Sequence, residues 1–309
     1  MNTIYVIGSS NTDMVVQCKK LPRPGETVLG GEFFRANGGK GANQAVAAAR
    51  LGGKVTFVCH VGDDAFGRES LEAYKREDID VSRITVDPGG PSGVALILVG
   101  EGGENMIAVA SGVNAKVSPE NVEFLHEVLT PGDIVLMQLE IPVETVMYAA
   151  RIGREKDAVV ILDPAPAPPE GMPETIYPLL NYILPNQHEA TMLLGSEDEP
   201  AKMAQEFHKR GVRHAIITLG DEGVVLSAEL GDFELPSHYV TAVDATAAGD
   251  AFAGALAVAL AEEYKTREAI AFAQIAAALS VTRRGAQPSL PKREEVEKLF
   301  VNNTFTEPH

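Results

Sequence analysis

Residues 134–162 have the sequence IVLMQLEIPVETVMYAARIGREKDAVVIL, in which two short apolar runs flank a longer amphipathic segment. The apolar runs, Ile134–Gln138 and Val159–Leu162, have the composition and length of buried strands. Val143–Lys156 between them has the apolar spacing of a helix that covers a sheet. Strands that are apolar throughout and separated by helices predict a mostly parallel sheet covered on both faces.

The same alternation continues through most of the chain. Further buried strands are predicted at Ile4–Gly8, Val55–Cys59, Ile183–Leu184 and Ala215–Leu219. Further helices are predicted at Gly41–Leu51, Phe66–Arg76, Pro119–Leu129, Glu189–Leu194, Ala201–Arg210, Gly249–Glu262, Thr266–Ser280 and Arg293–Phe300. Ser118 is the expected N-cap of one of them, because the proline that follows suits the first helical position. The chain is therefore expected to form one α/β domain over residues 1–309.

Two stretches interrupt this pattern with runs in which polar and apolar residues alternate singly. They are Met14–Phe34 and Gly93–Ala110, the second around a turn at Gly100–Gly103. Both are predicted to form strands of a small second sheet, inserted at about residues 14–36 and 93–110, which serves as a lid. The alternative is a pair of surface hairpins that do not move.

The composition excludes several classes of partner. The 26 basic and 43 acidic residues give a formal charge of −17, so neither nucleic acid nor an anionic membrane is expected to bind. Cys18 and Cys59 make neither a metal-ligand spacing nor a disulfide framework. The apolar run at Thr3–Gly8 lacks a basic leader and is short for a signal peptide, and no stretch approaches the ~18 apolar residues of a membrane span. A cytosolic location is expected.

The strongest chemical signal is the stretch Val243-Asp244-Ala245-Thr246-Ala247-Ala248-Gly249-Asp250-Ala251-Phe252-Ala253-Gly254. Small residues before an Ala-rich helix leave its first N–H groups open to an anion, with Asp250 just inside the helix end. An anion site beside a carboxylate suits phosphoryl transfer to an alcohol. The carboxylate takes the hydroxyl proton, and the N–H groups stabilise charge on the phosphate.

A second candidate is the loop Gly38-Gly39-Lys40-Gly41-Ala42-Asn43. It does not match a Walker A loop, because Phe34 and Arg35 occupy the region of the first glycine. Nor does it match a dinucleotide fingerprint, because Gln44 stands at the third glycine. Lys40 and Asn43 are donors on a loop that can approach a ligand closely, which suits a polyhydroxylated compound. A tight turn that needs glycines for its backbone angles explains the loop equally well.

Three polar residues are expected at one edge of the sheet. Asn11 and Asp13 follow the first strand, and Glu140 follows another. Ligands of open α/β sheets bind at the carboxyl ends of the strands, and Asp13 suits two neighbouring hydroxyl groups. Each residue alone is equally typical of a cap or a solvated side chain, so their common edge carries the prediction.

Three further segments have two interpretations each. Asn186 and Glu189 open a helix and suit a hydrated Mg²⁺ that holds phosphate oxygens, although helix capping explains their spacing better. Thr218–Gly223 joins two strands through a turn that fits either a nucleotide contact or a plain hairpin. Ser280–Ser289 either supplies carbonyl groups, with Asp244, to a weakly hydrated cation or simply leads out of a helix. The histidines have no metal-ligand spacing.

Together these residues resemble the PfkB-type carbohydrate kinases over nearly the whole chain. Two family signatures occur in order: Gly38–Ala45, with Gly52 and Gly62 downstream, and Ala247–Asp250. The resemblance implies a doubly wound, mostly parallel sheet with helices on both faces and a small β-sheet lid.

Three stretches favour the subgroup of this family that phosphorylates D-ribose: Gly39–Asn43, Met137–Glu140 and Pro164–Pro166. The resemblance implies transfer of the γ-phosphate of ATP to the 5-hydroxyl of D-ribose, which gives D-ribose 5-phosphate and ADP. It also implies Mg²⁺, activation by K⁺ and a homodimer formed through the lids.

Taken position by position, the resemblance implies four groups of site residues. Asp250 is the base, and the anion hole is formed by Ala247, Ala248 and Gly249. The sugar-binding positions are Asn11, Asp13, Gly39, Lys40, Asn43, Glu140 and Asp250. The nucleotide and Mg²⁺ positions are Asn186, Glu189, Thr218, Gly220, Gly223 and, beside the adenine, Gln274. The K⁺ loop positions are Asp244, Thr246, Ser280, Arg283, Gly285 and Ser289.

Three positions depart from the family pattern. Ala245 stands where Thr or Ser is usual, Ala251 where Thr is frequent, and Gln274 where Asn or His often borders the adenine. None removes a charged catalytic group, so activity is expected, while cation affinity, loop rigidity and nucleotide preference are affected. The alternatives are a kinase of the same family for fructose, deoxyribose or a nucleoside, and a sugar sensor without turnover, against which the retention of Asp250 argues.

Overall fold

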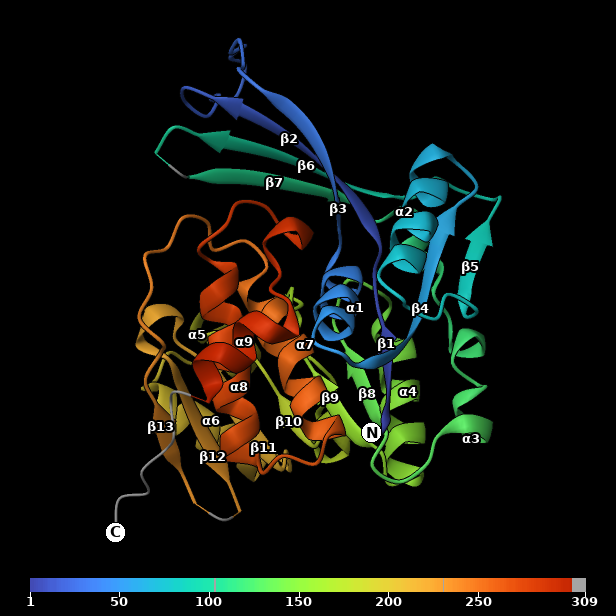
Figure 1. Cartoon of the computed structure of the whole chain (residues 1–309), viewed down its shortest axis with the longest axis vertical. Helices are drawn as coiled ribbons and strands as arrows, with labels where there is room; N and C mark the ends of the chain where they lie inside the picture. Colours follow the sequence, from blue (N-terminus) through green and yellow to red (C-terminus); the bar gives the residue numbers. More distant parts are fainter. Residues whose placement is uncertain (103, 230, 302–309) are drawn as a thin grey trace.

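The computed structural model describes residues 1–102, 104–229 and 231–301, and a large sheet runs through its centre (Figure 1). Within these residues the sheet has nine strands in the order β13-β12-β11-β10-β9-β8-β1-β4-β5. The pairs β11–β12 and β12–β13 are antiparallel and the others are parallel. The strands are β1 (Thr3–Ile7), β4 (Lys54–Gly62), β5 (Ile84–Asp87), β8 (Ile134–Met137), β9 (Val159–Leu162), β10 (Tyr182–Ile183), β11 (His214–Thr218), β12 (Val224–Ala228) and β13 (Phe233–Leu235).

The six strands predicted for this sheet are confirmed, with small shifts at their ends. β12 is the second of the two strands expected around the turn at Thr218–Gly223. The sequence pattern does not indicate β5 and β13, which lie at the two edges of the sheet. Both are short and contain exposed or half-buried side chains, so they lack the apolar run that marks a central strand.

Helices cover both faces of the large sheet, because both faces of its strands are apolar. In β1, Ile4 and Val6 belong to one buried cluster and Tyr5 and Ile7 to the other. The first cluster lies under α1 (Lys40–Arg50), α2 (Ala65–Arg76), α7 (Ala248–Ala261), α8 (Thr266–Ser280) and α9 (Arg293–Phe300). The second lies under α3 (Leu125–Val128), α4 (Val143–Glu155), α5 (Gln187–Leu194) and α6 (Pro200–Lys209). The predicted covered sheet is confirmed.

One predicted helix is wrong. The helix expected at Pro119–Leu129 is a 3₁₀ turn, η2 (Pro119–Asn121), followed by the single-turn α3. The Asn121 side chain accepts a hydrogen bond from the Ser118 backbone N–H (2.8 Å) and contacts His60 Nε2 (3.1 Å). The bond from Ser118 to Asn121 is part of a capping box that starts the turn, but the backbone bonds that follow are mostly of the tighter 3₁₀ type. Ser118 is the N-cap, as predicted. The other 3₁₀ turns are η1 (Gly112–Lys116), η3 (Glu174–Leu179), η4 (Gly220–Glu222) and η5 (Gln287–Ser289).

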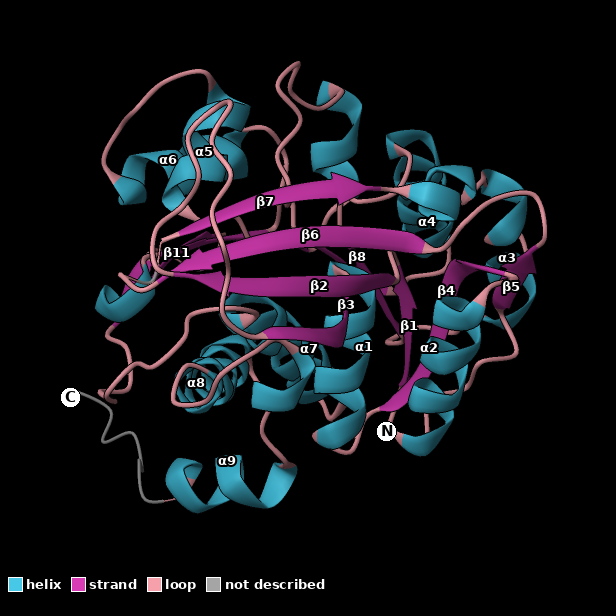
Figure 2. Ribbon diagram, turned by 90° about the horizontal axis from the view of Figure 1, so that it is seen from above, coloured by secondary structure: helices cyan, strands magenta, loops and turns pink. Residues whose placement is uncertain are grey.

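A second sheet lies across one end of the large one (Figures 1 and 2). Its strand order is β3-β2-β6-β7. The strands are β2 (Asn11–Cys18), β3 (Phe33–Gly38), β6 (Gly93–Gly100) and β7 (Asn105–Ala110). β2 pairs with β6 in parallel, so the two inserted stretches form one sheet rather than two separate hairpins. The predicted second sheet is therefore confirmed, and its opening and closing as a lid stay a prediction.

The second sheet is slightly larger than predicted, because β2 begins at Asn11 and β3 ends at Gly38. Residue 103 of the predicted turn and residues 302–309 of the predicted domain lie outside the described residues. In the part of the chain that the structure describes, no helix is long and apolar enough to cross a membrane.

Candidate active site

The N-terminus of α7 lies at the edge of the large sheet that faces the second sheet. α7 begins at Ala248, one residue before the predicted start, and its N-cap residue Ala247 makes no side-chain cap. Among the described residues, the backbone N–H groups of Gly249 and Asp250 have no hydrogen-bond acceptor. Gly249 is exposed and Asp250 is buried. Free N–H groups beside a buried carboxylate make the predicted anion site physically possible.

Ala247 has a left-handed backbone conformation, with φ of +60°. This conformation costs an alanine about 1–2 kcal/mol relative to the right-handed region. Strained backbone of this kind is concentrated at functional sites, where the surrounding structure holds it in place. The strain therefore supports a functional role for the turn at Ala247–Gly249.

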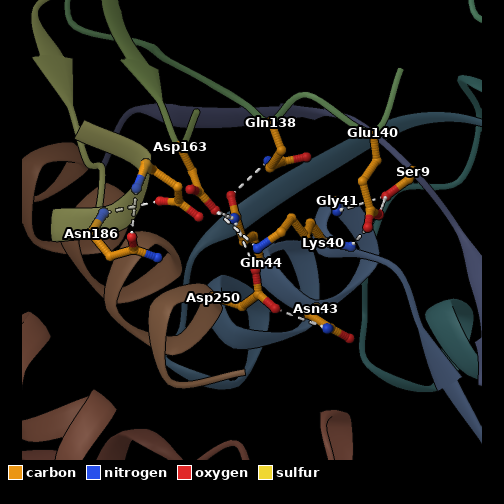
Figure 3. A network of polar contacts seen from close by, with 11 residues as sticks. Ser9, Lys40, Gly41, Asn43, Gln44, Gln138, Glu140, Asp163, Asn186 and Asp250 are labelled. Atoms are coloured by element: carbon orange, nitrogen blue, oxygen red, sulfur yellow. Dashed lines mark hydrogen bonds and ion pairs between the residues drawn. The ribbon is translucent and has the colours of Figure 1, made fainter. Parts of the chain in front are cut away.

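Asp250 is held by two neighbouring side chains of α1 (Figure 3). Asn43 Nδ2 donates to Asp250 Oδ2 at 2.9 Å, and Gln44 Nε2 donates to Asp250 Oδ1 at 3.0 Å. Asn43 Oδ1 is buried and has no hydrogen-bond partner within the described chain. It can therefore accept a hydrogen bond from a hydroxyl group of a ligand.

The glycine-rich loop is both a strained turn and the start of a helix. α1 begins at Lys40, after Gly39 with φ of +89°. A Cβ atom on Gly39 would lie 2.7 Å from the backbone N of Asn11, and one on Gly41 would lie 2.5 Å from the backbone N of Ser9. Only glycine allows this close approach, which brings the start of α1 against the chain between β1 and β2.

Glu140 fixes the same loop from the end of β8. Its Oε2 accepts hydrogen bonds from the Lys40 backbone N–H (3.0 Å) and from the Ser9 hydroxyl (Figure 3). Asn11 and Glu140 also line one pocket of about 340 Å³, together with Val109, Asn114 and Pro166. Asn114 Nδ2 donates to Asn11 Oδ1 at 2.8 Å and fixes that side chain. The structure thus places Asn11 and Glu140 at one edge, as predicted.

Asp13 lies close enough to Glu140 and Asp250 to interact with their carboxylates electrostatically. Burial, together with the nearby carboxylates of Glu140 and Asp250, raises the pKa of Asp13 to about 7. Gly38 makes room for it, because a Cβ atom there would lie 2.2 Å from the Asp13 carboxylate oxygens. A buried acid with a raised pKa beside two further carboxylates is typical of a functional site.

Lys40 is the cation of the cluster. Its Nζ lies 3.9 Å from Asp163 Oδ2, and its side chain is 30% exposed. Burial alone lowers the pKa of Lys40, but Asp163, Asp250 and Glu140 together raise it above its ordinary value. Lys40 therefore stays protonated and is available to an anionic ligand.

Asn186 and Glu189 form a reciprocal helix cap at the start of α5. Asn186 Oδ1 accepts from the Glu189 N–H, and Glu189 Oε2 accepts from the Asn186 N–H, both at 2.9 Å. The capping interpretation is thus confirmed for the local contacts. Asn186 is exposed and also forms an isolated bridge with Thr218 of β11, so the two predicted nucleotide segments lie side by side.

The turn after β11 contains η4, and its glycines have positive φ: +63° at Gly220 and +107° at Gly223. A Cβ atom on Gly223 would lie 2.1 Å from the Leu235 carbonyl oxygen. Gln274 on α8 donates from Nε2 to the carbonyl oxygens of Leu235 (3.0 Å) and Pro236 (3.2 Å). Its amide thus supports the chain after β13.

The loop before α7 is tied to the loop after α8 through Asp244. Asp244 Oδ2 accepts from the Gly285 N–H at 2.8 Å, and Oδ1 accepts from the Thr246 N–H at 2.9 Å. These bonds lower the pKa of Asp244, although burial by itself raises it. Ser280 and Ser289 are buried and donate to nearby carbonyl oxygens.

The Arg283 side chain points toward α9 rather than into this loop, because it pairs with Glu295. Arg283 can therefore contribute to the predicted K⁺ loop only through its backbone, because its side chain is paired with Glu295. No cluster of His, Cys, Asp and Glu that suits a metal occurs among the residues that the structure describes.

Three residues of the site were not predicted as functional: Gln44, Gln138 and Asp163. Gln44 Nε2 donates to Asp163 Oδ2 at 2.7 Å, and Gln138 Nε2 donates to Gln44 Oε1 at 2.6 Å (Figure 3). Burial raises the pKa of Asp163 to about 7, with Lys40 opposing and Asp250 adding to the shift. A sequence signal existed, since Gln138 and Asp163 each follow a buried strand and Gln44 follows the glycine-rich loop.

Known proteins match this chain over almost its whole length. The pfkB family carbohydrate kinase model matches residues 1–293. A ribokinase of Haemophilus influenzae is 41% identical over 297 residues, which cover 95% of this chain and 96% of that protein. A crystal structure of ribokinase from Thermotoga maritima is 39% identical with a TM-score of 0.89, and covers 98% of this chain and 100% of its own. A structure of Arabidopsis thaliana ribokinase complexed with ribose and ATP is 31% identical with a TM-score of 0.87, and covers 97% of this chain and 99% of its own.

Proposed function

The chain belongs to the pfkB family of carbohydrate kinases, and we propose from this that it acts as a ribokinase. It transfers the γ-phosphate of ATP to the 5-hydroxyl of D-ribose and gives D-ribose 5-phosphate and ADP. Relatives named as ribokinases that match almost the whole chain support this function. The structural observation that carries it is Asp250, a buried carboxylate beside the free N–H groups at the start of α7.

Asp250 is proposed as the base. It lies in the first turn of α7, where the positive end of the helix dipole attracts negative charge. An aspartate is a weak base for an alcohol, so it takes the proton late, as the new O–P bond forms. Positioning of the two substrates then supplies much of the acceleration. Free N–H groups of the Ala247–Gly249 turn, such as that of Gly249, stabilise the charge on the transferred phosphoryl group. The Ala248 N–H donates to the Ala245 carbonyl oxygen at 3.2 Å and takes part only if this bond opens.

The sugar is proposed to bind between the glycine-rich loop and the second sheet. Asp13 and Glu140 accept hydrogen bonds from its hydroxyl groups, and Asn43 offers the unpartnered Oδ1 that a hydroxyl group suits. The common placement of these groups near Asp250 supports this assignment. The remaining proposed contacts come from Asn11, Gly39 and Lys40.

ATP is proposed to lie along the neighbouring edge, over Thr218, Gly220 and Gly223. The bridge between Asn186 and Thr218 supports one continuous surface for it. Asn186 and Glu189 fit a hydrated Mg²⁺, because the helix cap uses only one of the two Glu189 carboxylate oxygens and one lone pair of Asn186 Oδ1. Oxygen ligands suit this ion. When bound there, Mg²⁺ would neutralise charge on the phosphate oxygens.

The loop tied by Asp244 is proposed to hold K⁺. Its side-chain and carbonyl oxygens are the donors that a weakly hydrated cation takes. The proposed ligands come from Asp244, Thr246, Ser280, Arg283, Gly285 and Ser289, with Arg283 contributing through its backbone. Because Asp244 hydrogen-bonds Gly285 and Thr246, a cation there would order the turn that leads into the anion site.

A homodimer through the second sheets is also proposed. Phe33, Leu96 and Met106 are 61%, 55% and 50% exposed. Their register places them on the face of the sheet opposite Asn11 and Asp13. An exposed apolar sheet face of this kind fits a protein interface.

The free thiols of Cys18 and Cys59 fit the proposed cytosolic location.

ADP release tests the function directly. The protein is assayed with ATP, Mg²⁺ and K⁺ against D-ribose, deoxyribose, fructose and nucleosides. We expect a strong preference for D-ribose. Preference for another sugar would keep the reaction and replace the substrate. Ribose binding without any ADP release would support the sensor alternative, which the relatives and the retained Asp250 do not favour.

A further inference from the structure

Gln44 lies between two buried carboxylates. Its Nε2 donates to Asp250 Oδ1 at 3.0 Å and to Asp163 Oδ2 at 2.7 Å, and its side chain is fully buried. One amide nitrogen has two hydrogens, so both bonds form at once. Gln44 thus links the end of β9, where Asp163 lies, to the first turn of α7 (Figure 3).

The orientation of the Gln44 amide is fixed by chemistry. As the proposed base, Asp250 is ionised and only accepts hydrogen bonds, so the Gln44 nitrogen must face it. The oxygen then faces Gln138, whose Nε2 donates to it at 2.6 Å. The other orientation would set the amide oxygen against the Asp250 carboxylate. Both ends of the side chain are therefore held.

Close packing of α1 against α7 sets the distance that Gln44 spans. A Cβ atom on Gly254 would lie 2.7 Å from Ala47 Cβ and 2.8 Å from the Gln44 carbonyl oxygen. Gly254 therefore lets the two helices approach. Asn43, the neighbour of Gln44, holds the other oxygen of Asp250. Each oxygen keeps a further lone pair for a substrate hydroxyl group.

We propose that Gln44 is the positioning residue that fixes the Asp250 carboxylate for proton removal, and that Asp163 is the acceptor that fixes Gln44. The inference rests on the proposed function and deepens it. Small displacements of a catalytic group cost large factors in rate, because the reacting atoms must meet in a narrow geometry. Gln44 touches no reacting atom, so its effect is expected in turnover and not in sugar affinity.

The test variant is Gln44→Met, which keeps the length and volume of the side chain and removes both donors. Loss of a hydrogen bond to a charged group predicts a fall in kcat of about 10- to 100-fold. The KM for ribose should stay near the wild-type value, and the crystal structure of Gln44→Met should show the Asp250 carboxylate rotated. Thermal unfolding checks that the variant is folded.

The matched control is Gln138→Met, which removes the donor to Gln44 Oε1 and leaves both bonds to the carboxylates. Its kcat should fall much less. At the other end, Asp163→Asn keeps an acceptor oxygen for Gln44, whereas Asp163→Leu keeps the branching at Cγ without an acceptor. Both remove the charge beside Lys40, so their difference isolates the acceptor. We expect a large fall in kcat for Asp163→Leu and a much smaller fall for Asp163→Asn.

Wild-type kcat in Gln44→Met would overturn the proposal. So would an equal loss in Gln138→Met, because the role would then be general packing. If the wild-type protein does not phosphorylate ribose, the proposed function fails separately. The positioning role is then decided by the Gln44→Met crystal structure, where an unchanged Asp250 carboxylate would reject it.

Discussion

Asn43 donates a hydrogen bond to Asp250 across 207 residues of sequence, with 2.9 Å between Nδ2 and Oδ2. The first residue lies in the glycine-rich signature and the second at the start of α7. The contact joins the segment proposed for the sugar to the segment proposed for the phosphate. The proposed base therefore lies between the segments proposed for the two substrates, where an acceptor hydroxyl would meet the phosphoryl group.

Asp250→Asn should remove most of the turnover. Asparagine keeps the size of the side chain but takes no proton, and loss of a general base costs about 100- to 10,000-fold in kcat. The affinity for ribose should change only a few-fold, because the other sugar contacts remain. Steady-state ADP release and ribose titration measure the two quantities. Turnover close to that of the wild type would reject Asp250 as the base.

The fold was predictable where one residue pattern decided an element. Helix α8 and strand β9 occur at the predicted residues, because their apolar periodicity agrees with their burial. The helix expected at Pro119–Leu129 was wrong because the backbone bonds from Asn121 to Glu127 are of the 3₁₀ type, which the apolar spacing of this segment does not distinguish from an α-helix.

The sequence predicted part of the cluster that the structure brings together, and the function of this cluster stays a prediction. Asn43 and Asp250 belong to motifs whose composition points to ligands. Gln44 and Asp163 follow the glycine-rich loop and a buried strand, but the sequence does not reveal the contact between these residues, which are 119 positions apart. The Arg283 side chain likewise pairs with Glu295, which only the position of α9 explains.

Asp13 should make folding stability depend on pH. Its pKa is about 7 in the folded protein and near 3.8 when unperturbed. Between these values the folded state binds the proton more strongly than the unfolded chain, so the stability contributed by Asp13 falls as pH rises through this window. Asp13→Asn removes the effect. Its Tm relative to the wild type, without ligands, should rise from about pH 4 to pH 7 and then level off.

Scanning calorimetry across this pH range measures the difference. Asp157→Asn is the control, because Asp157 is exposed and lies beyond the end of α4. Its Tm difference should stay flat. A flat difference for Asp13→Asn as well would show that folding does not raise the pKa of Asp13.

Leu96→Lys should disrupt the proposed dimer. Leu96 is 55% exposed on the apolar face of the second sheet, and a buried lysine without a partner opposes association. Light scattering should give the mass of a dimer for the wild type and of a monomer for the variant. Val301→Lys is the control, since Val301 is 71% exposed and lies after α9, at the opposite end of the chain from the sheet. A dimeric Leu96→Lys protein would exclude this face as the interface.

Asp244→Asn should weaken activation by K⁺. In the wild type, exchange of K⁺ for Na⁺ at constant ionic strength should lower kcat several-fold, because the larger and less strongly hydrated ion fits a loop of carbonyl and side-chain oxygens better. In the wild type, Asp244 Oδ2 accepts a hydrogen bond from the Gly285 N–H at 2.8 Å. In the variant, the side-chain amide nitrogen replaces this oxygen, so two donors face each other and the bond is lost. The loop after α8 would then separate from the turn before α7, and the ratio of the K⁺ and Na⁺ rates should fall toward one. Asp157→Asn should keep the wild-type ratio. Equal wild-type rates in the two salts would remove K⁺ from the mechanism, and the bonds of Asp244 would then serve only to join the two loops.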